Sequence, residues 1–269
     1  MGVNAQLREL DIDIPAQPDA LVRMSLLLAR DSIDLPAVAQ LVESDMALAA
    51  AVLKAVNSSL YGLDGRVQTV QQAITYLGLR EVAAITYEMG LRAAFPPAAE
   101  LEPLWDRAGR RGLVMGRLAQ ALDADAWAAH SAGLFEECGK AVLFRHASDH
   151  YRAMLRAAPD DASLLELEKV GFGVAHDALG AALCESWGLA AAAVASVRHH
   201  VGVLASGELP QAVDKRPVCG LSVIANALLF EPEALEPAIE RIAPQVAWEP
   251  ARVLKAARRV QAALDPITV

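Results

Sequence analysis

The segment ESDMALAAAVLKAVNSSLYG, residues 43–62, carries the strongest structural signal in the chain. Asp45 is a favourable capping residue, and the apolar residues after it recur three and four positions apart. A polar run then ends this pattern before a Tyr-Gly pair turns the chain. The segment therefore predicts an amphipathic helix with one buried face. The residues of that face are Leu48, Val52, Leu53 and Val56, and the polar run is Asn57, Ser58 and Ser59.

Helical patterns continue on both sides of this segment. Asp34 with Pro36 begins an earlier helix, Thr69 opens a capping-box pattern, and Gly78 is typical of a helix end. Beyond Pro96-Pro97 the helical period continues, and we find no convincing strand and no repeat of fixed period. The sequence thus predicts an all-α protein with two lobes. We expect an N-terminal helical lobe over residues 1–97, a second helical lobe over 98–202 and a helical extension, 203–269, that packs on the core.

Composition excludes several classes of protein. The 269 residues carry a formal charge of −9, which gives no electrostatic footprint for nucleic acid or for an anionic membrane. The three cysteines show no CxxC spacing, so a disulfide framework or a zinc knuckle is not expected and a reducing cytosol fits. We find no signal peptide and no uninterrupted apolar run of ~20 residues, and we expect a cytoplasmic protein without a membrane span. P-loop, GxGxxG and GxSxG motifs are also missing from the sequence.

The six histidines are the first candidates for chemistry, because neutral imidazole is a good metal ligand. His176 precedes a glycine-containing helix, and His199 and His200 follow an apolar helical stretch. Side chains of adjacent helical residues diverge by about 100°, so both members of the pair rarely bind one ion. The alternative is that these histidines cap carbonyl groups near helix ends or line a pocket.

A second candidate is the acidic pair in HSAGLFEECGKAVLF, residues 130–144. Glu136 and Glu137 could hold Mg²⁺ or Mn²⁺, or one could act as a general base. Adjacent glutamates on a helix are more often solvated, but the apolar residues on both sides draw at least one of them inward. A buried carboxylate needs a partner, and Lys140 is the only local one. Burial therefore implies a distant cation or a metal.

These patterns, taken in order, resemble the HDOD domains, the signalling branch of the HD-domain superfamily, over residues 14–202. The resemblance implies a wholly helical, two-lobed bacterial protein of the cytosol with a regulatory output, often in cyclic-di-GMP or two-component signalling. The similar segments are 43–62, Val67–Leu79, Ala132–Lys140 and His176–His200. The signature residues, for which we expect a structural role, are Asp45, Asn57, Ser58, Tyr61, Gly62 and Gly78.

The chain departs from the catalytic members of that superfamily. In those enzymes a His-Asp dyad binds one or two metals with outlying His and Asp ligands, and the dyad positions here are Glu136 and Glu137. Arg107 stands at the position of an outlying His, and Asn226 at that of the last Asp. A guanidinium repels a divalent cation, and the extra methylene of Glu moves the ligand oxygens. The residues that keep their type are His176, His199 and His200.

We therefore expect a degenerate site in which Arg107 pairs with Glu136 or Glu137 and fills the former metal position. The alternative is that Arg107 lies on the surface and the pocket is packed shut. No catalytic residue, metal or cofactor is expected. The weak metal candidates are Glu136, Glu137, His176 and His199.

The expected function is non-catalytic signal transduction through binding of a protein partner or of a small ligand, possible nucleotides included. The oligomeric state is left open. The alternative is a metal-dependent phosphohydrolase or phosphodiesterase with an altered ligand set, in which the metal activates water. That set would be Glu136, Glu137, His176, His199 and His200, and Arg107 argues against it.

Overall fold

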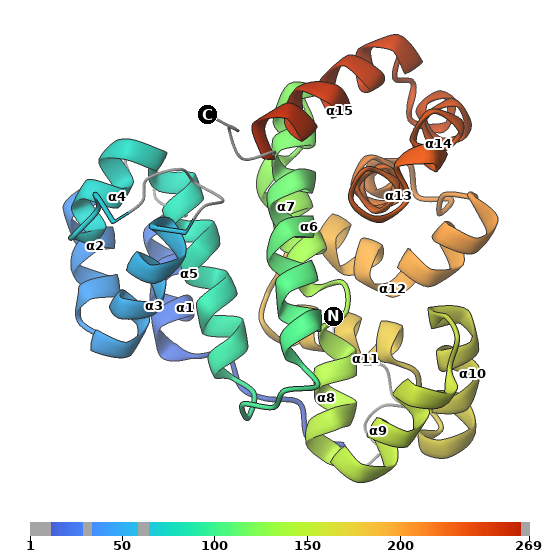
Figure 1. The fold of residues 1–269 in the computed structure, drawn as a ribbon, viewed down its shortest axis with the longest axis horizontal. Helices are drawn as coiled ribbons and strands as arrows, with labels where there is room; N and C mark the ends of the chain where they lie inside the picture. The colour runs from blue at the N-terminus through green and yellow to red at the C-terminus, as the bar shows by residue number, and fades with distance from the viewer. Residues whose placement is uncertain (1–11, 29–33, 59–64, 265–269) are drawn as a thin grey trace. The chain divides into compact units, whose positions relative to one another are not determined.

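The structure is a computed structural model that describes residues 12–28, 34–58 and 65–264. The described part of the chain is helical and contains no strand, which confirms the predicted all-α class (Figure 1). No single helix in these ranges is long and apolar enough to cross a membrane. Two consecutive helices, α2 (Leu35–Glu43) and α3 (Met46–Val56), pass that test together, but the chain bends by 112° between them.

The chain divides into two compact units. Of the described residues, the smaller unit comprises 16–28, 34–58, 65–96 and 263–264, and the larger one comprises 12–15 and 97–262. Two residues of the N-terminal segment contact the larger unit. Asp13 forms an ion pair with Arg145 at 2.7 Å, and the carbonyl of Pro15 accepts a hydrogen bond from the indole of Trp187 at 2.9 Å. These contacts tie the segment to the larger unit, whereas the sequence analysis placed it in the N-terminal lobe.

The smaller unit is a group of short helices around an apolar core. Its core side chains come from every helix and include Met24, Val42, Val52, Ile74 and Ile85. The helices α3 and α4 both pack on α5, and α1 contacts α2 and α5. The elements are α1 (Asp19–Leu28), α2, α3, α4 (Val70–Leu77) and α5 (Leu79–Ala93).

The predicted caps position these helices. Asp45 is the N-cap of α3, and its carboxylate accepts hydrogen bonds from two backbone N–H groups of the first turn at 3.0 Å. Thr69 caps α4 in the same way. Gly78 separates α4 from α5 with φ +86, a conformation that a glycine adopts without strain. Tyr61 and Gly62 lie outside the described residues, and Ser58 follows the end of α3, half-buried.

Asn57 fastens the end of α3 to a distant segment. Its side-chain amide donates to the carbonyls of Leu53 at 2.9 Å and Val67 at 2.7 Å, and its oxygen accepts from the Val67 N–H at 3.1 Å. The amide thus satisfies both backbone groups of Val67, as a neighbouring strand would.

Replacing Asn57 by Ala should destabilise the smaller unit by about 1–3 kcal/mol, because the Val67 N–H and C=O lose their partners in a half-buried place. Hydrogen exchange of the Val67 amide measures the effect directly and should accelerate. Thr75→Ala is the control, since its hydroxyl is exposed and bonds only within α4. Equal exchange in the Asn57 and Thr75 variants would refute a role for Asn57.

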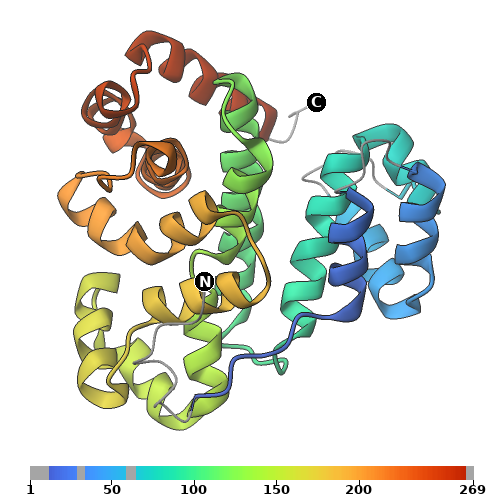
Figure 2. The same ribbon diagram turned by 180° about the vertical axis from the view of Figure 1, so that it is seen from behind.

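The larger unit is built on two helices that lie side by side, α6 and α7, with α12 and α13 against them (Figures 1 and 2). The helix α11 packs between α8 and α12. The helices after residue 203 belong to this unit, and Arg252 of α15 bonds to Asp123 at 2.6 Å beyond the end of α6. The elements are α6 (Glu102–Ala121), α7 (Ala126–Phe135), α8 (Cys138–His146), α9 (Ser148–Ala157), α10 (Asp161–Phe172), α11 (His176–Ser186), α12 (Ala191–Ser206), α13 (Arg216–Phe230), α14 (Leu235–Ile242) and α15 (Pro250–Leu264).

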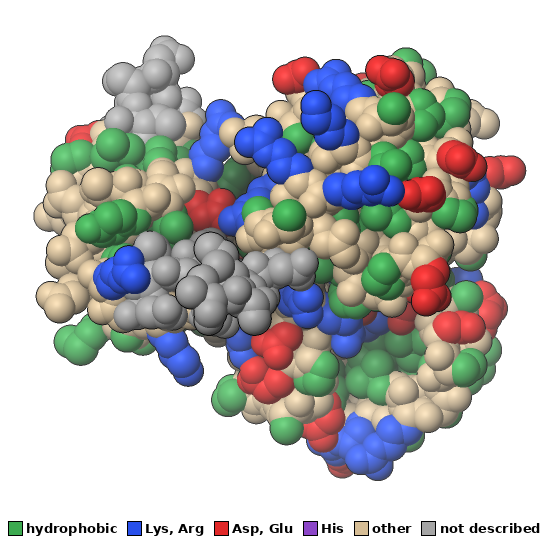
Figure 3. Space-filling view, turned by 45° about the horizontal axis from the view of Figure 1, so that its top comes forward, with side chains coloured by type: hydrophobic (Ala, Val, Ile, Leu, Met, Phe, Trp, Pro, Cys, Tyr) green, Lys and Arg blue, Asp and Glu red, His purple; other side chains and the backbone are tan. Residues whose placement is uncertain are grey.

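Charged side chains of both signs are intermingled over the larger unit on the face that Figure 3 presents. This face therefore carries no extended field of one sign.

Candidate functional site

The site forms where α7 ends and α8 begins, beside α6. Glu136 and Glu137 occupy the junction, and they are 0% and 3% exposed. Gly133 of α7 lets α6 approach closely, because a Cβ at Gly133 would lie 2.8 Å from the backbone carbon of Arg111 in α6. The apolar flanks noted in the sequence thus draw both carboxylates inward, rather than only one.

Glu137 is surrounded by three cations. Arg107 donates to its two oxygens at 3.1 and 3.2 Å, in the fork geometry that suits a carboxylate. Arg111 lies 3.3 Å and Lys140 2.6 Å from it. The predicted ion pair of Arg107 with one of the two glutamates is thus present. It is made to Glu137.

Glu136 has a separate set of partners. Arg111 Nε lies 3.3 Å from Oε1, and the hydroxyl of Ser222 donates to Oε2 at 2.7 Å. Ser222 belongs to α13, the same helix as Asn226, which the sequence analysis placed at the position of the last Asp of the pocket. Asn226 lies one turn further on, half-buried, and donates to Glu231 at 3.4 Å instead. The structure therefore does not bring Asn226 into the site.

The charges of this group balance. Lys140 also binds Asp161 of α10 at 2.7 Å, which gives three carboxylates and three cations. We call this group the charged cluster: Arg107, Arg111, Glu136, Glu137, Lys140 and Asp161.

The surroundings keep Glu137 and Lys140 ionised. Burial alone would raise the pKa of Glu137, but the charges of Lys140, Arg111 and Arg107 hold it well below its usual range. Burial likewise opposes the charge of Lys140, yet Glu137 and Asp161 raise the pKa of its ammonium. Each ion is thus stabilised by the others.

The dyad positions do not fit a metal ion. Both oxygens of Glu137 are engaged by cations, and Arg111 adds a buried positive charge between the two glutamates. A divalent ion there would have to displace an arginine that is 5% exposed. The hydrolytic chemistry of an HD dyad therefore has no support at Glu136 and Glu137.

The three histidines that keep the residue type of the resembled family, His176, His199 and His200, lie in two different environments. His176 and His200 are 0% and 2% exposed, and their rings lie 5.4 Å apart. His199 directly precedes His200 in α12, and its side chain is exposed. Partial desolvation of the ring and the charge of Arg198 lower the pKa of His199. The structure thus does not bring His199 into the site, because adjacent helical side chains diverge by about 100°.

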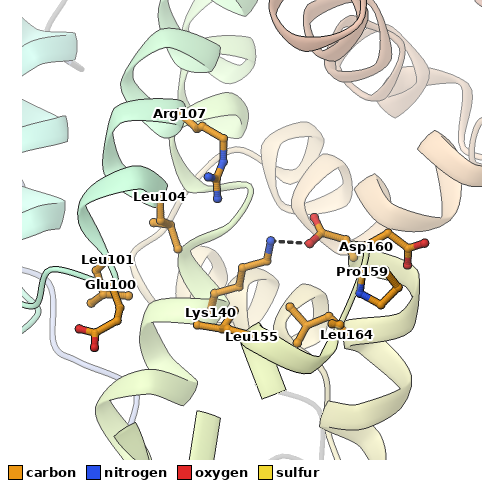
Figure 4. A pocket seen from close by; sticks show the side chains of 11 residues that line it. Glu100, Leu101, Leu104, Arg107, Lys140, Leu155, Pro159, Asp160 and Leu164 are labelled. Carbon is orange, nitrogen blue, oxygen red and sulfur yellow. Dashed lines mark hydrogen bonds and ion pairs between the residues drawn. The ribbon is translucent and has the colours of Figure 1, made fainter. Parts of the chain in front are cut away.

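A pocket of about 200 Å³ opens over one side of the charged cluster (Figure 4). Arg107 extends into it from α6, and Lys140 reaches across its floor to Asp161. The walls are apolar side chains together with the start of α10. The residues that line it include Leu101, Leu104, Leu155, Pro159, Asp160 and Leu164.

Sequence reasoning missed four important residues of the site. Arg111 had a signal, since it lies four positions after Arg107 and so shares its helix face. Asp161, Glu168 and Ser222 had none, because each comes from a helix far along the chain. Glu168 is fully buried and accepts from the Tyr151 hydroxyl at 2.5 Å and from the His176 N–H at 2.8 Å.

The fold and the site define an all-helical protein with an HD-like pocket whose dyad positions are filled by an internal charge network. The HDOD domain family model matches residues 14–203, and the chain belongs to this family.

Solved structures share the fold. An HDOD domain protein of unknown function from Geobacter sulfurreducens has a TM-score of 0.71 and 18% identity, with 97% of this chain and 95% of that chain covered. A protein of Shewanella amazonensis named as a candidate phosphohydrolase gives 0.72 and 18%, with 97% and 96% covered. The MmoQ response regulator of Methylococcus capsulatus gives 0.51 and 21%, with 91% and 98% covered. At these identities the likeness concerns the fold alone.

An uncharacterized protein of Treponema pallidum is 27% identical over 220 residues, which is 80% of this chain. The chain spans 42% of the length of that curated relative. The relative thus contains a comparable region within a longer protein.

Proposed function

We propose that the protein is a non-catalytic component of signal transduction that acts by binding a protein partner or a small ligand. The observation that carries the proposal is the charged cluster, in which three cations hold the two carboxylates at the dyad positions. A hydrolase of this fold needs those positions for a metal that activates water. Membership of the HDOD family supports the same conclusion.

The pocket favours a protein partner over a whole nucleotide. Its volume of about 200 Å³ is smaller than the ~300–1,000 Å³ usual for small-molecule sites. Both of its central cations are already paired, Arg107 with Glu137 and Lys140 with Asp161. A phosphate group entering the pocket would have to compete with these carboxylates.

Hydrolysis assays test the proposal. The purified protein should not cleave cyclic-di-GMP or bis(p-nitrophenyl) phosphate when Mg²⁺, Mn²⁺ or Zn²⁺ is supplied. His176→Ala, purified identically, controls for a contaminating hydrolase, because turnover in both preparations belongs to the contaminant. Metal-dependent turnover that this substitution abolishes would overturn the proposal and establish the phosphohydrolase alternative.

Equilibrium dialysis with cyclic-di-GMP separates the two forms of the proposal. We expect no saturable binding, which directs the search to a protein partner. Tight binding without turnover would instead make the protein a nucleotide receptor. In that case Arg107→Gln should weaken the binding about tenfold or more, since a charge-assisted hydrogen bond contributes roughly 1.5–3 kcal/mol.

A further inference from the structure

The pocket over the charged cluster combines apolar walls with a polar floor (Figure 4). Four leucines, which lie in or next to α6, α9 and α10, supply the walls, so an aliphatic group can enter the pocket out of water. The volume of about 200 Å³ suits a ligand much smaller than a nucleotide. The four wall leucines are Leu101, Leu104, Leu155 and Leu164.

The two cations at the floor keep unused N–H donors. Arg107 bonds to Glu137 through Nε and Nη2, and its Nη1 has no hydrogen-bond partner among the described residues. Lys140 uses two of the three N–H groups of its ammonium, one for Glu137 and one for Asp161. Arg107 is also accessible, since 39% of its side chain is exposed. A carboxylate that enters the pocket can therefore accept hydrogen bonds from both cations without displacing the carboxylates already bound.

The charge balance of the cluster makes a bare anion a poor ligand. The three cations of the charged cluster are already matched by its three carboxylates. An added phosphate or carboxylate would leave an uncompensated negative charge in a partly buried place. A ligand that carries its own positive charge avoids this cost, because a zwitterion is neutral as a whole.

A carboxylate at the edge of the pocket can receive that positive charge. Asp160 lines the pocket and is exposed, and no cation in the described part of the chain pairs with it. One of its oxygens caps α10 by accepting from the Ser163 N–H at 2.7 Å, which leaves the other oxygen available. The same hydrogen bond lowers the pKa of Asp160, so the carboxylate is ionised at neutral pH. Glu100, which also lines the pocket, is instead paired with Arg152 at 2.5 Å.

We propose that the pocket binds a free aliphatic α-amino acid of about the size of leucine. Its carboxylate accepts hydrogen bonds from Arg107 and Lys140, its ammonium binds the available oxygen of Asp160, and its side chain packs among the four wall leucines. This names the ligand for the small-ligand form of the proposed function and rests on that form. The bound amino acid touches α6, α8 and the start of α10, and it therefore stabilises the larger unit.

Calorimetric titration of the purified protein with L-leucine tests the site. We expect one equivalent to bind with a dissociation constant of about 10 µM to 1 mM, a range normal for so small a ligand. Two analogues separate the ends of the molecule, since 4-methylpentanoate lacks the ammonium and leucinamide lacks the carboxylate. Each should bind about tenfold or more weakly than L-leucine. L-Glutamate should not bind, because its side chain would place a charge among the leucines.

Asp160→Asn removes the charge at the edge of the pocket and keeps a good N-cap for α10. It should weaken the binding of L-leucine about tenfold and leave the weak binding of 4-methylpentanoate unchanged, since that analogue has no ammonium. Asp125→Asn is the matched control, because Asp125 is the exposed N-cap of α7 and does not line the pocket. Its affinity for L-leucine should equal that of the native protein.

Arg107→Gln tests the other end of the ligand. It should weaken both L-leucine and 4-methylpentanoate about tenfold, because both present a carboxylate to the floor of the pocket, and should change the binding of leucinamide little. Thermal unfolding by tryptophan fluorescence checks that each variant is folded, and added L-leucine should raise the midpoint of the native protein and of Asp125→Asn.

Three outcomes overturn the inference: no binding of L-leucine, equal affinity for L-leucine and leucinamide, or an equal loss of affinity in Asp160→Asn and Asp125→Asn. Equal affinity for leucinamide would mean that the pocket takes an apolar side chain of a peptide. None of these readouts involves hydrolysis. Phosphodiester turnover would contradict the proposed function and leave leucine binding as measured, whereas failure to bind leucine would remove the inference and leave the protein-partner form of the proposed function in place.

Discussion

Glu137→Gln should destabilise the larger unit by about 3–5 kcal/mol, the usual cost of removing one partner from a buried ion pair. The substitution keeps the shape of the side chain but leaves Arg107, Arg111 and Lys140 without the carboxylate that they share. Two of these cations, Arg111 and Lys140, are each 5% exposed, so water cannot replace the lost charge.

Tryptophan fluorescence during urea unfolding measures this effect in the larger unit. All four tryptophans, Trp105, Trp127, Trp187 and Trp248, lie between residues 97 and 262. Glu236→Gln is the control, because it breaks the exposed pair with Arg258 and should cost less than about 1 kcal/mol. Similar midpoints for the two variants would show that the charged cluster contributes no more than a surface pair.

The same comparison has a defined pH dependence. The pKa of Glu137 is lower in the folded protein than its ordinary value of about 4.3, so its stabilising effect is complete above that value. It is lost as the pH falls from there toward the lower folded pKa. The difference in stability between the native protein and Glu137→Gln should therefore be largest near pH 7 and shrink below about pH 4. A difference that grows on acidification would contradict the ionised, paired state of Glu137.

Gly139→Ala should be at least as damaging, with a loss of about 3 kcal/mol or more. A Cβ at this position would lie 1.9 Å from the carbonyl oxygen of His176 and 2.8 Å from the nitrogen of Gly180. Both neighbours are backbone atoms of α11, so they cannot move aside as a flexible side chain would. The helices α8 and α11 must separate, and the packing around His176 changes with them.

Gly202→Ala is the matched control for this prediction. Gly202 also lies inside a helix, α12, but it is exposed and an added Cβ meets no atom within 4 Å. Alanine there should be neutral or stabilise by up to about 1 kcal/mol, since it restricts the unfolded chain. Resistance to limited proteolysis and the urea midpoint both report the result. Equal stability of the two variants would mean that α8 and α11 are not in close contact.

The charged cluster and the buried histidines His176 and His200 differ in how their polar groups are satisfied. The charged cluster is self-neutralising, so it stabilises the HD-like pocket without providing a metal centre at Glu136 and Glu137. His176 and His200 each keep one buried ring nitrogen without a hydrogen-bond partner among the described residues.

Local sequence alone determined the helical class and several of the helix ends. Asp34, Asp45 and Thr69 are caps in the structure as predicted, because a short polar side chain before an apolar helical run satisfies the free N–H groups of the first turn. The apolar flanks of the acidic pair also predicted the burial of at least one of the two glutamates, and both are buried. These features depend on neighbours a few residues away, which the sequence displays directly.

Only the tertiary structure decided the partners of the acidic pair and of the histidines. Arg110 and Arg111 are adjacent and identical in type, yet the phase of α6 exposes one and buries the other. Ser222 reaches Glu136 across 86 positions, because α13 packs against α7. The break between α8 and α9 at Ala147, where φ is −149, is likewise a feature that helical periodicity does not display. A buried charge is stabilised by whichever groups the fold brings within a few ångströms, and that distance is not encoded in local sequence.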